Sequence, residues 1–321
     1  MSDTGVVLAV AFGLAFALTN GMHDAANAIA TLVGTRAARP GPAVTLAAAA
    51  NILGPVLLGS AVADTIEGIV TVPSDQVVGV IGAGLTGAVV WNLLTWWRGI
   101  PSSSGHALLG GLVGAAIVEG GIDAVNWGGF DGVKPVGVIG VAVVLALAPV
   151  VGFLAGFGAD RGARATARRA TRRARGPVRA GQWTMSGALA LAHGANDAQK
   201  SVGVIVVVLV AAGDVSRSGI PVWVELAAGV ALTVGTAFGG WPIVRTIGRR
   251  IVTLRPVDGL ASQTSGAAVL LGASALGAPV STTQVVASSV VGVGVGHRRW
   301  RHVRWMVVRS MLLAWLITVP A

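Results

Sequence analysis

Two aspartates set in apolar surroundings are the residues best placed to do chemistry. Asp24 lies within the motif Gly21 to Asn27, and Asp197 lies within the similar motif Gly194 to Lys200. A carboxylate is costly to bury unless it is paired, so each aspartate predicts a cation beside it. That cation is either sodium, held by carboxylate and carbonyl oxygens, or a proton on the carboxyl group. The alternative interpretation places both aspartates in a water-filled vestibule, where they would still mark a pathway.

Two clusters of hydroxyl side chains form the second chemical feature. One cluster follows Pro101 directly, and the other begins two positions after Pro279. The members are Ser102, Ser103 and Ser104 in the first cluster and Ser281, Thr282 and Thr283 in the second. Hydroxyl and free N–H groups at a helix start suit a tetrahedral oxyanion. Capping and helix packing are the alternative use of such residues, but their repetition favours a ligand.

The aspartate motif and the hydroxyl cluster occur in the same order in both halves of the chain. Asp24 lies 77 positions before Pro101, and Asp197 lies 82 positions before Pro279. Two matched motifs at a matched spacing indicate an internal duplication.

The composition identifies the solvent in which these residues lie. Hydrophobic residues make up 54% of the 321 positions, charged residues make up 11%, and the mean hydropathy is +0.76. In soluble domains roughly a quarter of the residues are charged. This chain has too few charged residues to cover a water-exposed surface. Apolar runs such as Val136 to Phe157 are longer than the strands of about ten residues that build membrane barrels. The sequence therefore predicts an all-α, multi-pass protein of the cytoplasmic membrane.

Arginine-rich loops predict the orientation of the segments. They lie at Arg36 to Arg39, at Arg98, from Arg161 to Arg179, from Arg245 to Arg255 and from Arg298 to Arg304. The positive-inside rule makes these loops cytoplasmic, and the simplest count is then about ten passes with both termini outside. Re-entrant hairpins would alter that count. The net charge of +10 thus reflects topology, and no nucleic-acid partner is predicted.

In this topology the two motif copies run in opposite directions across the membrane. Pro101 is expected near the cytoplasm and Pro279 near the outside. The predicted halves are residues 1–158 and 181–321, joined by a basic cytoplasmic linker, 159–180, with eight arginines between Asp160 and Ala180. Glycine and asparagine around each aspartate predict an unwound break in its helix. The expected fold is two inverted-topology repeats with broken helices and hairpins, in about 10 to 12 membrane segments, which is typical of alternating-access transporters.

The motif Gly194 to Asp197 matches the signature of the PiT family of inorganic phosphate transporters. Gly21 to Asn27 resembles the bacterial variant of that signature, and the segments around Pro101 and Pro279 resemble the family's hairpins. The resemblance covers both halves of the chain. It implies import of inorganic phosphate by cation symport, with the substrate between the repeats and a homodimer as the assembly.

The resemblance and the local residue types together indicate the site residues. The expected phosphate-binding residues are Ser102, Ser103, Ser104, Ser281, Thr282, Thr283, Asn196 and Lys200. The expected coupling-ion residues are His23, Asp24, Asn27 and Asp197.

Two positions depart from the sodium-coupled pattern. His23 stands where the other repeat has Asn196, and Lys200 stands where the first repeat has Asn27. A fixed ammonium would repel sodium, and a histidine side chain gains a proton near physiological pH. Proton coupling is therefore predicted, while Lys200 is left to neutralise phosphate or to pair with Asp197.

Several alternatives stay open at this point. Within transporters they are sodium-coupled phosphate symport, a related sulfate permease, and a neutral divalent-metal phosphate complex as the substrate. An intramembrane aspartyl hydrolase would also place two aspartates in membrane segments, but it would not need repeated hydroxyl hairpins, so no enzyme and no catalytic residue is predicted. An ion channel usually places its symmetry between subunits. Cysteine is absent. The four-residue spacing of His193 and Asp197 also occurs in metal sites, but neither a structural metal nor a cofactor is predicted.

Overall fold

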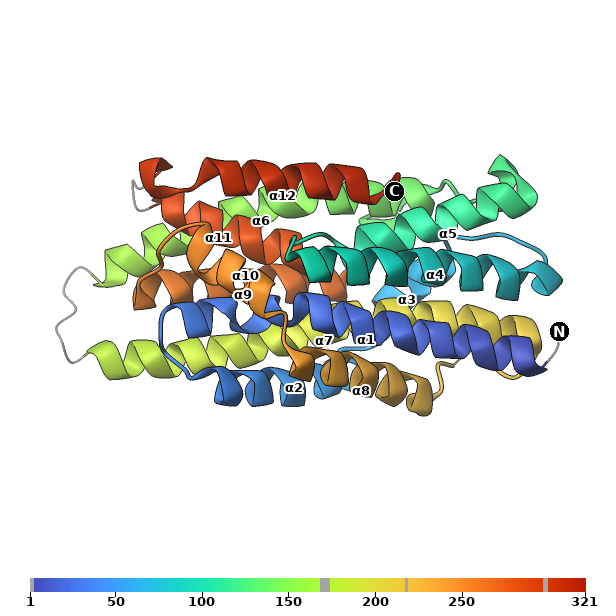
Figure 1. The fold of residues 1–321 in the computed structure, drawn as a ribbon, viewed down its shortest axis with the longest axis horizontal. Coiled ribbons are helices and arrows are strands. Elements are labelled where there is room, and N and C mark those ends of the chain that lie inside the picture. Colours follow the sequence, from blue (N-terminus) through green and yellow to red (C-terminus); the bar gives the residue numbers. More distant parts are fainter. Residues whose placement is uncertain (1–2, 168–173, 217–218, 297–299) are drawn as a thin grey trace.

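The computed structural model describes residues 3–167, 174–216, 219–296 and 300–321 and is almost entirely helical (Figure 1). The helices are α1 (Asp3–Gly34), α2 (Pro40–Leu57), α3 (Ala61–Glu67), α4 (Ser74–Arg98), α5 (Ser104–Gly120), α6 (Gly137–Ala167), α7 (Arg175–Ala212), α8 (Val222–Phe238), α9 (Trp241–Arg245), α10 (Pro256–Ala275), α11 (Thr282–Gly296) and α12 (Trp305–Thr318). Short turns are η1 (Ile122–Ala124), the π-helical η3 (Thr246–Arg250) and η4 (Trp300–His302). Strands β1 (Gly129–Asp131) and β2 (Lys134–Val136) form a small antiparallel hairpin before α6. The prediction of an all-α architecture is confirmed.

Long apolar helices give the chain its capacity to cross a bilayer. By length and composition, α1, α2, α4, α6 and α7 each suffice, among the described residues. The helix α8 together with α9 and η3 makes a sixth candidate, bent by 66° at the break. That bend falls at Gly239 and Gly240, and Gly239 has a φ of +64°, which favours glycine. A broken helix is therefore present, although not at the aspartates.

The predicted unwinding around Asp24 and Asp197 is wrong. Both α1 and α7 continue as α-helix through their motifs. The motif glycines serve close packing: a Cβ added at Gly21 would lie 2.0 Å from the carbonyl oxygen of Leu232 in α8, and one at Gly194 would lie 2.4 Å from that of Asn51 in α2. Small residues allow membrane helices to approach in this way. Each aspartate is thus held on an intact helix.

Replacement of Gly194 by Ala should lower the stability of the protein. The added methyl group would overlap the α2 backbone, and overpacking of this kind costs about 1 to 3 kcal/mol. Gly176→Ala, near the start of the same helix, is the matched control because nothing lies within 4 Å of its added Cβ. Thermal unfolding in detergent measures both variants. A Gly194→Ala melting temperature equal to that of Gly176→Ala would contradict this account of the motif.

Two helix hairpins turn back inside the protein. The first link (residues 99–103) joins α4 to α5, and the second link (residues 276–281) joins α10 to α11. In Figure 1, α4 and α5 occupy the right half of the molecule and α10 and α11 the left half, with the links near the middle. The hydroxyls that begin α5 and α11 contact the same carboxylate, that of Asp24. The expectation that Pro101 and Pro279 lie at opposite membrane faces is therefore wrong, and the hairpins reduce the number of full passes.

Helices from the two predicted halves interleave. The pairs in extensive contact include α1 with α8, α2 with α7, and α6 with α11. One large cluster of buried apolar residues spans α1, α7, α10 and α11. The predicted linker is partly helical, since residues 159–167 continue α6 and residues 175–180 begin α7; residues 168–173 lie outside the described part. The interleaving holds both aspartate-bearing helices next to both hairpins.

Candidate functional site

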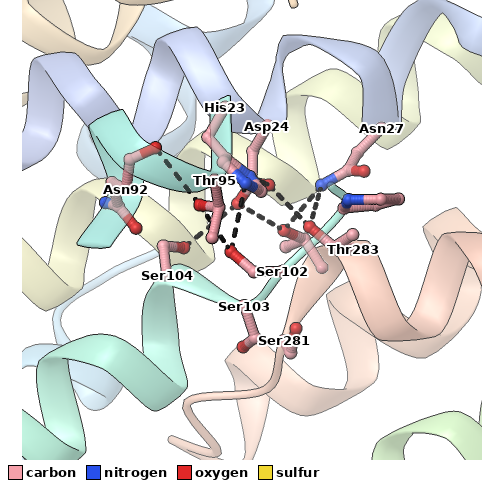
Figure 2. Close-up of polar contacts among 12 residues, drawn as sticks. His23, Asp24, Asn27, Asn92, Thr95, Ser102, Ser103, Ser104, Ser281 and Thr283 are labelled. Carbon is pink, nitrogen blue, oxygen red and sulfur yellow. Dashed lines mark hydrogen bonds and ion pairs between the residues drawn. The ribbon is translucent and has the colours of Figure 1, made fainter. Parts of the chain in front are cut away.

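The carboxylate of Asp24 gathers hydroxyl groups from both hairpins. It is buried, and its Oδ1 accepts a hydrogen bond from Thr283 Oγ1 at 2.6 Å. Its Oδ2 accepts one from Ser104 Oγ at 3.1 Å and lies 3.4 Å from Thr282 Oγ1. The Nδ1 atom of the adjacent His23 lies 3.1 Å from Oδ1. Figure 2 shows these groups converging from α1, α5 and α11.

The carboxylate of Asp197 is paired with a buried ammonium group. Lys200 Nζ donates to Asp197 Oδ1 and, at 2.7 Å, to the carbonyl oxygen of Val280 in the second link. The Oδ2 atom accepts from Thr282 Oγ1 at 2.8 Å, and His193 Nε2 lies 3.0 Å from it. Lys200 is 1% exposed. Because an unpaired buried ammonium would be very costly, this lysine is a fixed part of the site.

A single hydroxyl joins the two halves of the site. Thr282 Oγ1 contacts Asp24 Oδ2 and Asp197 Oδ2, and the amide of Asn27 donates to Thr282 at 3.1 Å and to Thr283 at 3.0 Å. A hydroxyl has one proton, so Thr282 donates to one carboxylate at a time. The second contact becomes a hydrogen bond when that other carboxyl group is protonated and donates in turn. Thr282 is therefore the hydroxyl that the two carboxylates share.

The same cluster offers ligand atoms to a cation. Ligand atoms of Asp24, His193 and Asp197 all lie within 4.8 Å of one another, and all three residues are buried. Hard cations prefer the oxygen ligands in this set. The Lys200 ammonium already neutralises Asp197, so any added cation would meet one positive charge at short range. The sequence-based expectation of no structural metal stays a prediction.

Three of the residues expected at the site lie apart from the carboxylates. Ser103 caps α5 by accepting from the His106 N–H at 3.3 Å, and Ser281 accepts from the Gln284 N–H at 3.4 Å at the start of α11. The Asn196 amide donates to Ser274 Oγ and to the Ala278 carbonyl of the second link. In Figure 2, Ser103 and Ser281 lie away from the bonds around Asp24. The first residues of the two capped helices, Ser104 and Thr282, contact the carboxylates, so the partial positive charge of both helix N-termini lies at the cluster and favours an anion.

Ser102 reaches the site indirectly. Its hydroxyl lies 3.1 Å from His23 Nε2 and donates to Thr95 Oγ1 at 3.0 Å. His23 therefore touches Asp24 through one ring nitrogen and the first link through the other. This chain of contacts connects the carboxylate to the hairpin.

Sequence reasoning missed two supporting residues. Asn51 Oδ1 lies 3.0 Å from His193 Nδ1 and fixes the ring beside Asp197, and the Asn51 amide donates to Thr236 in α8 at 3.0 Å. Thr95 holds Ser102 from within α4. The available signal for Asn51 was a single strongly polar side chain in the otherwise apolar helix α2.

Comparisons with known proteins show which family the chain is similar to. The Phosphate transporter family matches residues 20–166 and again residues 158–321. A probable low-affinity inorganic phosphate transporter of Bacillus subtilis is 39% identical over 98% of this chain and 92% of its own length. A protein of Rhizobium meliloti with the same description is 40% identical over 97% of this chain and 91% of its own length. A solved structure titled "The sodium-dependent phosphate transporter" has a TM-score of 0.85 and 26% identity, covering 99% of this chain and 96% of that one.

These matches confirm the predicted resemblance, the transport of phosphate and the location in the cell membrane. The double family match also agrees with the repeated order of motifs. The chain belongs to the phosphate transporter family, as a multi-pass PiT-type membrane protein.

Proposed function

We propose that this protein imports inorganic phosphate by proton symport, with the substrate held between Asp24, Asp197 and the two hairpin links. The observation that carries the proposal is the Lys200 ammonium, buried between Asp197 and the second link. A cationic group beside one of the two carboxylates disfavours sodium there and attracts an oxyanion. The sodium dependence named for the solved relative belongs to that protein.

Proton and phosphate binding favour one another in this site. The hydroxyls of Ser104, Thr282 and Thr283 are directed at the carboxylates. Protonation of Asp24 removes its negative charge and makes its oxygens weaker hydrogen-bond acceptors. The hydroxyls then become available to donate to phosphate oxygens. Because binding linkage is reciprocal, bound phosphate then raises the affinity for the proton by the same factor.

The two hairpins provide a route to alternating access. Similar halves that insert with opposite orientation can exchange conformations, which would open the central site to one side and then to the other. Coupling is needed because each negative charge that enters against a negative interior costs about 2.3 kcal/mol per 100 mV. One or more accompanying protons offset that cost.

The carboxylates also favour phosphate over sulfate. A protonated phosphate can donate a hydrogen bond to Asp24 or Asp197, whereas sulfate has no proton to donate at neutral pH. A site that contains acceptors therefore leaves sulfate with unfavourable oxygen-to-oxygen contacts. The acceptors therefore favour phosphate as the substrate over the sulfate of a related permease.

Labelled phosphate uptake into proteoliposomes tests the proposal. An inward proton gradient without sodium should drive accumulation, and excess sulfate should leave it unchanged. Uptake that requires sodium and ignores the proton gradient would overturn the coupling, and competition by sulfate would overturn the substrate. The assay repeated with magnesium and then with a chelator tests a divalent-metal phosphate complex, which predicts that chelation abolishes uptake.

A further inference from the structure

A polar pocket opens beside the end of α1, at the face that carries the arginine-rich loops. Its volume is 400 Å³, and its lining residues are Gly34, Thr35, Arg36, Gly248, Arg249, Thr253 and Leu254. The positive-inside rule makes this face cytoplasmic. None of the lining residues belongs to the central site, so the pocket is a separate feature.

Two glycines bring the walls of the pocket together. A Cβ added at Gly34 would lie 2.5 Å from the carbonyl oxygen of Gly248, and one at Gly248 would lie 2.4 Å from that of Ala30. Only glycine allows α1 and the π-helical turn η3 to approach this closely. Arg36 follows Gly34 by two positions and Arg249 follows Gly248 directly. The backbone contact therefore fixes both arginines at one pocket.

The backbone at Arg36 is held in an unusual conformation. Its φ is +61°, and Arg36 is the single non-glycine residue with a positive φ in the described part of the chain. The turn closes α1 through the Arg36 N–H bonded to Val33 and the Ala37 N–H bonded to Leu32. Glycine is the usual residue at such a helix end. An arginine kept there at a conformational cost points to a use for its side chain.

The charges of the pocket are of one sign. Two of the lining residues, Arg36 and Arg249, are basic, and none is acidic. Helix α10 packs against the pocket at Gly259, where an added Cβ would lie 2.7 Å from Thr35. The acidic residue of α10 next to this contact is Asp258. Asp258 is already neutralised, because Arg164 donates to it at 2.6 Å. A guanidinium group matches the oxygen geometry of a phosphate, to which it can donate two hydrogen bonds.

We propose that Arg36 and Arg249 bind a phosphate group at the cytoplasmic mouth of the transporter. The ten positions from Asp24 to Gly34 place it roughly 15 Å along α1 from the central site. Free inorganic phosphate on its way out of the protein and the phosphate head group of an inner-leaflet lipid present the same chemistry. The first source rests on the proposed import of phosphate, whereas the second is independent of it.

Equilibrium binding of labelled inorganic phosphate to the purified full chain, in nanodiscs of neutral phosphatidylcholine, tests the site. The double variant Arg36→Asn and Arg249→Gln removes both charges, and asparagine tolerates the left-handed backbone at position 36. Arg250→Gln is the matched control, because Arg250 is exposed on the same turn but does not line the pocket. The same measurements on Asp24→Asn separate this site from the central one, since the pocket shares no residue with it.

If free phosphate occupies the pocket, the double variant should bind one equivalent less, or bind it at least about tenfold more weakly, in both the wild-type and the Asp24→Asn background. If a lipid occupies it, phosphatidylglycerol nanodiscs should abolish that difference, and native mass spectrometry should show a phosphatidylglycerol retained by the wild type and lost from the double variant. Arg250→Gln should behave as the wild type in each arm. Phosphate and phosphatidylglycerol binding that are both indifferent to the double variant would overturn the proposal.

Discussion

Replacement of Asp24 by Asn should reduce phosphate uptake by at least about 100-fold. The carboxylate accepts hydrogen bonds from Ser104 and Thr283, and bonds to a charged acceptor contribute roughly 1.5 to 3 kcal/mol each. Asparagine keeps the shape of the side chain but presents an NH₂ group to one of these hydroxyls, and it cannot carry a proton. The neutral amide can neither take up nor release the coupled proton, and the one lost hydrogen bond adds a further factor of about ten, since 1.4 kcal/mol corresponds to a factor of ten.

Initial rates of labelled phosphate uptake in proteoliposomes measure this effect. Asp131→Asn is the control, because Asp131 is an exposed aspartate in the β1–β2 hairpin, away from the site. Elution as a single peak in size exclusion shows whether Asp24→Asn is folded. A tenfold loss of uptake corresponds to about 1.4 kcal/mol, roughly the energy of one hydrogen bond. If folded Asp24→Asn keeps more than a tenth of wild-type uptake, Asp24 is not a coupling residue.

The content of the central site could be predicted because its residues recur. Asp24 and Asp197 each precede a proline and a hydroxyl cluster at a similar distance, and a repeated pairing of this kind indicates a shared site. The structure brings Ser104, Thr282 and Thr283 to the carboxylates and begins α5 and α11 at two of them. The contacts of Asp24 with Thr282 and Thr283 join residues more than 250 positions apart, which local propensity alone could not place.

The helix breaks could not be located from the same residues. Glycine near a buried carboxylate fits both an unwound helix and a close helix–helix contact, and Gly21 and Gly194 turned out to serve the second. The depth of the two links was mispredicted because the positive-inside rule treats every apolar run as a full pass. At 17 and 15 residues, α5 and α11 are shorter than the approximately 20 residues that a full crossing needs. Neither helix is therefore long enough for a full crossing.

Replacement of Lys200 by Met should destabilise the protein by about 3 to 5 kcal/mol, the usual effect of removing one partner of a buried ion pair. Methionine has nearly the length of lysine, so the packing is kept while Asp197 loses its ion-pair partner. Combining Lys200→Met with Asp197→Asn removes the uncompensated charge and should recover most of the melting temperature. A single variant as stable as the wild type would show that Asp197 does not depend on the ammonium.

The same variant separates the two modes of coupling. Without the ammonium, Asp24 and Asp197 form a carboxylate pair joined by Thr282, with no cation between them. Sodium should then bind where the wild type excludes it, because the local charge has become more negative by one unit. We expect sodium chloride, compared with choline chloride, to raise the melting temperature of Lys200→Met and to leave that of the wild type unchanged. An equal effect of sodium on both proteins would mean that Lys200 does not exclude sodium, and the reason for preferring proton coupling would be lost.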